Sequence, residues 1–216
     1  MFTIRSNAPI ALLLLAPPGL ADSIDLRVTG RVIPSPCVVT FSQQGKIDFG
    51  MIEAGALNQH IGTPLRARQI DLRIDCAQLS GVALKISDGR ASSMIAGLVG
   101  PSTSDQEAFG LGLSRQARIG NYYVRMPREG LYVDGRKAEL LYSADGNKSW
   151  RRTGPAGELR RDRSFSWTWP ETRLPSHFKN LRGTLSVTPY IARAIDLPLE
   201  HEIDLDGQAS LELQYF

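Results

Sequence analysis

The last twelve residues, from Leu205 to Phe216, largely alternate apolar or small side chains with polar ones. A period of two residues predicts a half-buried β-strand with one apolar face. Because an unpaired strand edge is a template for association, we expect both edges of this strand to be covered, by an earlier strand or by a strand from another molecule. The residues on the predicted apolar face are Leu205, Ala209, Leu211, Leu213 and Tyr215.

Shorter alternating runs recur along the chain and predict further strands. Turn signals of the Asp-Gly and Gly-Asn type lie between them, at residues 88–89, 120–121, 134–135 and 145–146. Residues 91–107, rich in Ser, Gly and Ala, are interpreted as a surface loop or short helical turn, and no amphipathic helix of three turns is recognised. This pattern predicts an all-β fold, an immunoglobulin-like antiparallel β-sandwich. The runs are Ile24/Leu26/Val28, Ile70/Leu72/Ile74/Cys76, Val82/Leu84/Ile86, Phe109/Leu111/Leu113 and Leu185/Val187.

The first 21 residues have the features of a secretory signal peptide. Arg5 is followed by a largely apolar run from Ala8 to Ala16, which is too short to span a bilayer, and Gly19 and Ala21 form a small-residue cleavage site. We therefore expect residues 1–21 to be removed and residues 22–216 to form a single domain, 195 residues long.

Two cysteines, Cys37 and Cys76, lie beside strand-like segments. In an exported protein, a lone pair of cysteines is most simply a disulfide. On the chain-entropy model, closing this loop stabilises the fold by roughly 4 kcal/mol. The prediction is one disulfide between adjacent strands.

Charge and motifs do not indicate an enzyme or a nucleic-acid binder. The formal net charge is +3, and loss of Arg5 with the signal peptide leaves +2. Basic residues are spread along the chain, with one denser run at residues 148–163 and no groove-reading motif. The histidines His60, His177 and His201 lack ligand spacing, and no serine occupies a Gly-x-Ser-x-Gly turn. No catalytic, cofactor-binding or metal-binding residues are predicted.

An aromatic and basic stretch between Trp150 and Trp169 is the one segment where a ligand surface could lie. Tryptophan beside polar groups suits stacking against a sugar. In the sequence Phe165-Ser166-Trp167-Thr168-Trp169, however, the aromatic residues alternate, as they would on a strand that buries its aromatic face. Core packing is therefore the preferred interpretation, with a carbohydrate surface as the alternative.

Six segments together resemble the subunits of chaperone-usher fimbriae, and more closely the beta-fimbriae major-subunit-like family. They keep the same order along nearly the whole mature chain, with both cysteines in its first part and a penultimate tyrosine, Tyr215. The segments are Val28-Thr29-Gly30-Arg31-Val32-Ile33-Pro34-Ser35-Pro36-Cys37, Ile47-Asp48-Phe49-Gly50, Leu72-Arg73-Ile74-Asp75-Cys76, Phe109-Gly110-Leu111-Gly112, Gly183-Thr184-Leu185-Ser186-Val187 and residues 206–216.

The resemblance implies an immunoglobulin-like sandwich that lacks its last strand. In such families a periplasmic chaperone lends a strand, and the N-terminal extension of the next subunit later replaces it at the outer-membrane usher. The resemblance implies an exported subunit on the cell surface that contributes to adhesion. The chaperone and subunit interface is expected at Leu205, Gly207, Ala209, Leu211, Leu213, Tyr215 and Phe216, and the donor strand at Ile24, Leu26, Val28 and Gly30.

Alternatives remain open at two points. The segment Asp22–Thr29 is short for a donor strand, and its alternation would serve equally as the first strand of its own domain. For the whole protein, the preferred interpretation is a structural or tip subunit with other fimbrial subunits, and host or surface glycans, as further partners. A self-complete secreted β-sandwich that binds glycans is the alternative, and an enzyme would need a site that the sequence does not display.

Overall fold

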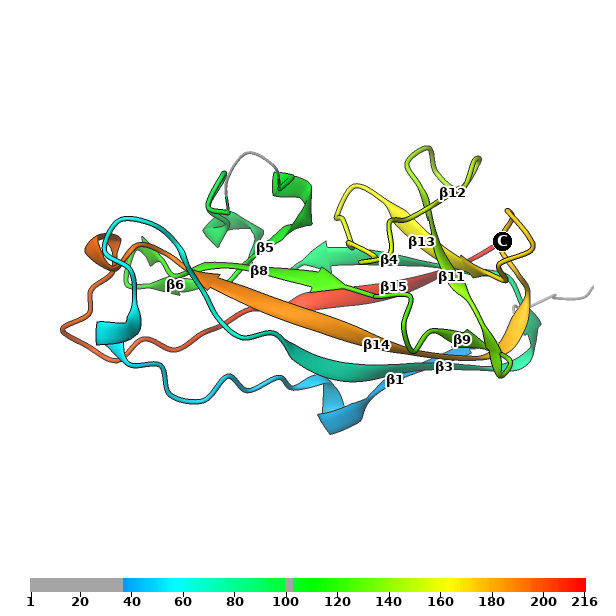
Figure 1. The fold of residues 1–216 in the computed structure, drawn as a ribbon, viewed down its shortest axis with the longest axis horizontal. Coiled ribbons are helices and arrows are strands. Elements are labelled where there is room, and N and C mark those ends of the chain that lie inside the picture. Colours follow the sequence, from blue (N-terminus) through cyan, green and yellow to red (C-terminus); the bar gives the residue numbers. More distant parts are fainter. Residues whose placement is uncertain (1–36, 100–102) are drawn as a thin grey trace, which may run out of the picture. The chain divides into compact units, whose positions relative to one another are not determined.

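Two antiparallel sheets make up most of the computed structural model, which describes residues 37–99 and 103–216 (Figure 1). The described residues belong to one compact unit. The predicted signal peptide of residues 1–21 and the alternating run at residues 24–28 lie outside the described part of the chain. Among the described residues, no helix is long and apolar enough to cross a membrane.

The first sheet has the strand order β1-β3-β14-β8-β5, and the second has the order β12-β11-β13-β4-β15. The bounds in the first sheet are β1 Cys37–Phe41, β3 Arg68–Ser80, β14 Phe178–Ile191, β8 Gly120–Arg125 and β5 Ala108–Gly110, with β2 Thr63–Pro64, β9 Tyr132–Val133 and β10 Arg136–Lys137 attached. The second sheet contains β12 Arg151–Arg152, β11 Glu139–Ser143, β13 Ser164–Thr168, β4 Val82–Asp88 and β15 Ala209–Tyr215. A separate ribbon pairs β6 Leu113–Ser114 with β7 Ala117–Arg118.

The core lies between the inward faces of these sheets, as the alternating runs predict. On β3 the buried positions are every second residue, Ile70, Leu72, Ile74 and Cys76. The aromatic run on β13 also packs inward, because Phe165 and Trp167 are fully buried. The Trp167 ring meets the Phe178 ring edge to face, with centroids 5.7 Å apart. The all-β prediction and the burial of this aromatic face are confirmed.

The two cysteines form the predicted disulfide. Cys37 on β1 stands opposite Cys76 on β3 in the antiparallel register, and their sulfur atoms are 2.08 Å apart. The cross-link therefore holds the first described strand to the edge of the longer strand β3.

The turn predictions have mixed outcomes. Asp134 and Gly135 connect β9 to β10 with φ values of 47° and 78°, as a tight hairpin turn requires. The predicted turn at Gly120-Asn121 is wrong, because both residues belong to β8. The Asn121 side chain is fully buried, and its amide donates to the Ile95 carbonyl and accepts from the Ile95 N–H, at 2.7 and 2.8 Å. A satisfied buried amide thus occupies a strand position.

Short 3-10 turns are the only helical elements in the described residues: η1 Ser42–Gly45, η2 Ala54–Ala56, η3 Ala91–Ser93, η4 Asp105–Glu107 and η5 Ala194–Asp196. Two of them, η3 and η4, lie in the stretch 91–107, where the sequence predicts a surface loop or short helical turn. The expected single run Phe109/Leu111/Leu113 is divided between β5 and β6, because Gly112 between them has a φ of +92° that a regular strand does not contain.

Candidate strand-binding groove

Strand β15 stands at the end of its sheet and has one partner, β4, among the described residues. Its register with β4 runs from Ala209 opposite Asp88 to Tyr215 opposite Val82. Upstream of β15 the same edge remains bonded, because Gly89 N–H donates to the Gln208 carbonyl and Asp206 N–H donates to the Leu111 carbonyl. The opposite edge of β15 has no strand partner in the described part of the chain.

The side chains predicted to form the interface alternate along this edge. Leu205, Ala209, Leu211 and Leu213 are half-buried and pack against the core, and Ile203 extends the series. Tyr215 and Phe216 are more open, with 41% and 50% of their surface exposed. The sequence-predicted interface residues therefore do lie together along one strand edge.

Gly207 occupies the one inward position that carries no side chain. A Cβ atom built on Gly207 would lie 2.8 Å from Cε1 of Tyr122. The Tyr122 side chain is buried, and its ring stacks on the ring of Phe109. The Tyr122 ring thus fills the space that a side chain at position 207 would need. Burial of the Tyr122 hydroxyl raises its pKa well above the usual value.

A second apolar rim faces the β15 edge across an open groove. It consists of Phe41 at the end of β1, Gly45 and the extended residues Ile47 and Phe49. Residues 47–52 make no backbone-to-backbone hydrogen bond with any described residue. Sequence reasoning did not assign this rim to the interface, although the alternation of Ile47 and Phe49 was the available signal.

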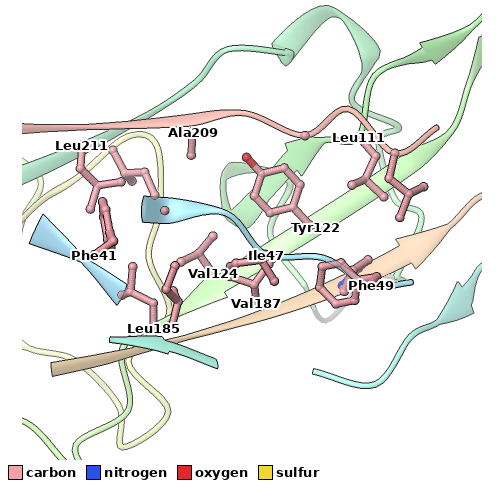
Figure 2. A pocket seen from close by; sticks show the side chains of 16 residues that line it. Phe41, Ile47, Phe49, Leu111, Tyr122, Val124, Leu185, Val187, Ala209 and Leu211 are labelled. Carbon is pink, nitrogen blue, oxygen red and sulfur yellow. The ribbon is translucent and has the colours of Figure 1, made fainter. Parts of the chain in front are cut away.

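The floor between the rims is apolar and comes from both sheets (Figure 2). Strands β3, β14 and β8 supply Ile70, Leu185, Val187 and Val124, and β4 supplies Ile86. The groove encloses about 200 Å³. It meets a second cavity of about 610 Å³ at Ile47, Phe49 and Leu205, and that cavity extends toward Leu57, Ile191 and Leu197.

A surface ion pair adds to the backbone hydrogen bond between Asp206 and Leu111 in holding the 206–207 segment to the sandwich. The guanidinium of Arg90 donates to both carboxylate oxygens of Asp206, at 2.8 and 3.0 Å, and to the Asp206 carbonyl at 3.2 Å. These hydrogen bonds lower the pKa of the Asp206 carboxyl and raise the pKa of Arg90. The pair fixes the backbone immediately before Gly207.

These features suit binding of an extended polypeptide. Free strand edges supply backbone donors and acceptors, and alternate apolar pockets receive every second side chain of an added strand. In residues 37–99 and 103–216, no cluster of three or more His, Cys, Asp or Glu side chains is placed to hold a metal ion. His201 lines the second cavity, while His60 and His177 are exposed elsewhere.

Comparison with known proteins gives two similarities. The model of a protein family of unknown function (DUF1120) matches residues 26–129, which include the Phe41–Phe49 rim and strands β3, β4 and β8. An uncharacterized Escherichia coli (strain K12) protein, YhcF, is 27% identical over 218 residues, covering 89% of this chain and 90% of the relative. The similarity to YhcF therefore takes in most of the chain, whereas the family match is limited to the part that precedes β14 and β15.

Proposed function

We propose that this chain is an exported structural or tip subunit of a chaperone-usher fimbria, and that its groove is filled by a strand from another polypeptide. The observation that carries the proposal is the apolar groove between residues 47–52 and the edge of residues 203–215 that faces away from β4, neither of which has a strand partner there in the described part of the chain. A strand placed there would gain hydrogen bonds at its edges and bury its alternate side chains.

The energetics explain why such a subunit would need a partner. About four apolar side chains of an inserted strand, at roughly 1.5 to 3 kcal/mol each, would contribute ~6 to 12 kcal/mol. This amount is comparable with the whole stability of an ordinary domain, about 5 to 15 kcal/mol. Without an inserted strand, the half-buried Leu205, Leu211 and Leu213 would stay partly in contact with water.

The proposed partners would occupy the groove one after the other. A periplasmic chaperone would cover the groove first, and the donor strand of another subunit would replace the chaperone at the outer-membrane usher. In this chain the proposed donor residues are Ile24, Leu26, Val28 and Gly30. The assembled fibre would lie on the cell surface and contribute to adhesion.

The lengths of groove and donor are compatible. The edge from Ile203 to Leu213 holds eleven residues, which at about 3.3 Å per residue span roughly 36 Å. Residues 22–33 offer twelve residues to a neighbouring copy, so a donor strand would not be limited to Asp22–Thr29. This length supports the proposed donor role.

A labelled synthetic peptide of residues 22–33 tests the proposal. It is titrated into the mature exported chain and into a variant that lacks residues 22–33, and fluorescence anisotropy reports binding. We expect saturable binding and a higher unfolding temperature of the receptor. The control peptide, with Ile24, Leu26 and Val28 all replaced by Asp, keeps the length and is expected not to bind.

The opposite result would favour the self-complete β-sandwich. If neither receptor binds the peptide, and the mature chain is a stable monomer that unfolds at the same temperature with or without it, donor-strand complementation is wrong. Binding of the peptide to the shortened variant alone would instead identify residues 22–33 as a strand of their own domain.

A further inference from the structure

A third cavity lies outside the groove, at the β11 and β12 end of the second sheet. It encloses about 280 Å³ and shares no lining residue with the groove or with the cavity next to it. Its lining residues are Leu141 on β11, Trp150, Arg151 and Arg152 at β12, and Arg173 in the loop after β13. Leu141 is fully buried and pairs with Arg152 in the sheet register.

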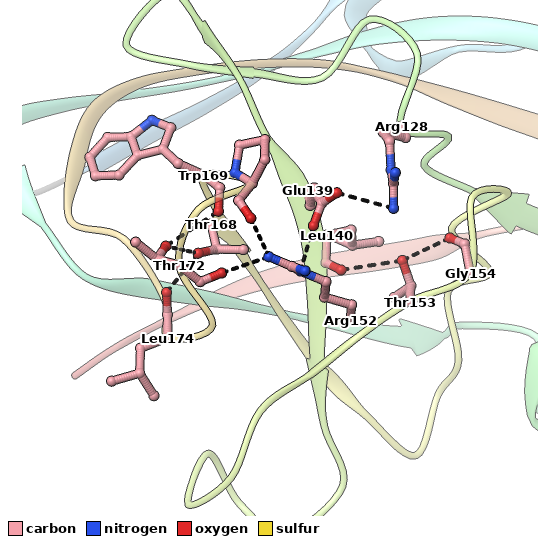
Figure 3. Close-up of polar contacts among 11 residues, drawn as sticks. Arg128, Glu139, Leu140, Arg152, Thr153, Gly154, Thr168, Trp169, Thr172 and Leu174 are labelled. Carbon is pink, nitrogen blue, oxygen red and sulfur yellow. Dashed lines mark hydrogen bonds and ion pairs between the residues drawn. The ribbon is translucent and has the colours of Figure 1, made fainter.

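Polar contacts fix the side chain of Arg152, one of the lining residues, in place (Figure 3). Its Nε lies 2.5 Å from Glu139, and its NH2 group donates to the carbonyl oxygens of Pro170 and Thr172 at 2.5 and 2.9 Å. Arg128 approaches the same Glu139 carboxylate at 3.2 Å. Two guanidinium groups therefore share one buried carboxylate, so this network keeps a net positive charge.

Two further arginines add to that charge. Arg151 and Arg173 are exposed, and neither forms a salt bridge with an acidic side chain in the described residues. Guanidinium groups bind carboxylates through paired, charge-assisted hydrogen bonds. The cavity is therefore suited to an anionic ligand.

Trp150 distinguishes this cavity from a simple basic patch. The other aromatic residues of the same sequence stretch are occupied: Phe165 and Trp167 are buried in the core, and the Arg136 guanidinium lies over the Trp169 ring at 4.9 Å. Trp150 is half-buried, packs near Phe216 with ring centroids 6.0 Å apart, and lines the cavity. An aromatic side chain with a few polar groups around a cavity is the usual composition of a small-molecule site.

We propose that this cavity binds an acidic saccharide, with the apolar face of the sugar ring against Trp150 and its carboxylate held by Arg173 and Arg151. The sugar class follows from the half-buried Trp150, which lines the cavity beside two guanidinium groups that form no salt bridge in the described residues. The proposal goes beyond the proposed function and does not depend on it, because the cavity and the groove have no residue in common.

Binding of 3′-sialyllactose and of trigalacturonate to the purified exported chain tests the proposal, with lactose as the neutral control. Intrinsic tryptophan fluorescence and calorimetry report affinity. We expect at least one acidic sugar to bind at least tenfold more tightly than lactose. Added salt should weaken that preference. Trp150→Ala and Arg173→Ala should each lower that affinity at least tenfold, while Trp150→Tyr should retain most of it. Arg118→Ala, which removes an exposed arginine on β7, serves as the matched control.

Several results would overturn this assignment. Equal affinity for lactose and both acidic sugars would show that the cavity does not select anionic ligands. An equal loss in Arg118→Ala and Arg173→Ala would indicate non-specific attraction to a basic protein. Binding of a poly-glutamate peptide with the same dependence on Trp150 and Arg173, and without sugar binding, would show a peptide site instead. Peptide binding to the groove is a separate measurement, so failure here would leave the proposed function standing.

Discussion

The backbone N–H of Cys37 donates a 2.8 Å hydrogen bond to the hydroxyl oxygen of Tyr215. This bond joins the first residue of β1 to the last residue of β15, which belong to different sheets. Cys37 is also cross-linked to Cys76 on β3. At this end, therefore, β1 and β15 are in direct contact.

Replacing Tyr215 with Phe should weaken that connection. We expect the free energy of unfolding to fall by about 0.5 to 1.5 kcal/mol, the usual net value of one hydrogen bond, with the disulfide intact. Thermal unfolding of the purified protein measures the loss. Tyr132→Phe is the control, since Tyr132 is 38% exposed. An unchanged midpoint for both variants would show that the contact does not contribute to stability.

The groove predicts that a negative charge is harmful at position 211 of β15 and harmless at the adjacent position 210. Leu211 faces the groove and Ser210 is exposed on the other face of β15. Leu211→Asp should lower both the periplasmic level and the affinity for the residue 22–33 peptide at least tenfold, because it places a carboxylate among apolar groups. Ser210→Asp should leave both unchanged. Leu211→Met keeps the apolar volume and serves as the control for a general folding defect. Equal levels and affinities for Leu211→Asp and Ser210→Asp would contradict the groove as the contact surface.

Position 207 should tolerate only glycine. In Gly207→Ala the new methyl group would meet the buried Tyr122 ring at 2.8 Å, so we expect a loss of about 1 to 3 kcal/mol, as for other overpacked sites. Chemical denaturation is the measurement. Gly55→Ala, where no atom lies within 4 Å of the added carbon, should change stability by less than half as much. A neutral Gly207→Ala would mean that Tyr122 moves away freely.

The Arg90–Asp206 pair predicts a dependence on pH. Its hydrogen bonds lower the pKa of Asp206 below the ordinary value of 3.8, so the stabilisation is present above that value and is lost as the pH falls through the lower, folded-state pKa. Both groups are exposed, so the effect should be small and weakened by salt. The stability difference between the wild type and Arg90→Gln should be greatest near neutral pH and disappear in acid. A difference that stays constant from pH 7 to below pH 3 would show that the Asp206 charge is not involved.

Local periodicity and residue chemistry are enough to predict part of this structure. The alternation at Ile70–Cys76 and Leu205–Tyr215 predicts which side chains turn inward, because successive residues of a strand point to opposite faces. Two cysteines that follow a predicted export signal predict their own pairing. Asp134-Gly135 predicts its hairpin, since both residues accept positive φ values.

Contacts between segments far apart in the sequence set which strands are neighbours and which edges of the described sheets are left open. Ile47 and Leu205 are 158 positions apart, and no local preference says that they line the same cavity. Gly120-Asn121 has the local sequence of a turn, but both residues lie in β8. There the buried Asn121 amide is hydrogen-bonded to the backbone of Ile95. In the same way Trp167 is fully buried and Trp150 only half-buried, because different segments pack around each. Burial depends on contacts between remote segments, whereas periodicity is a property of each segment alone.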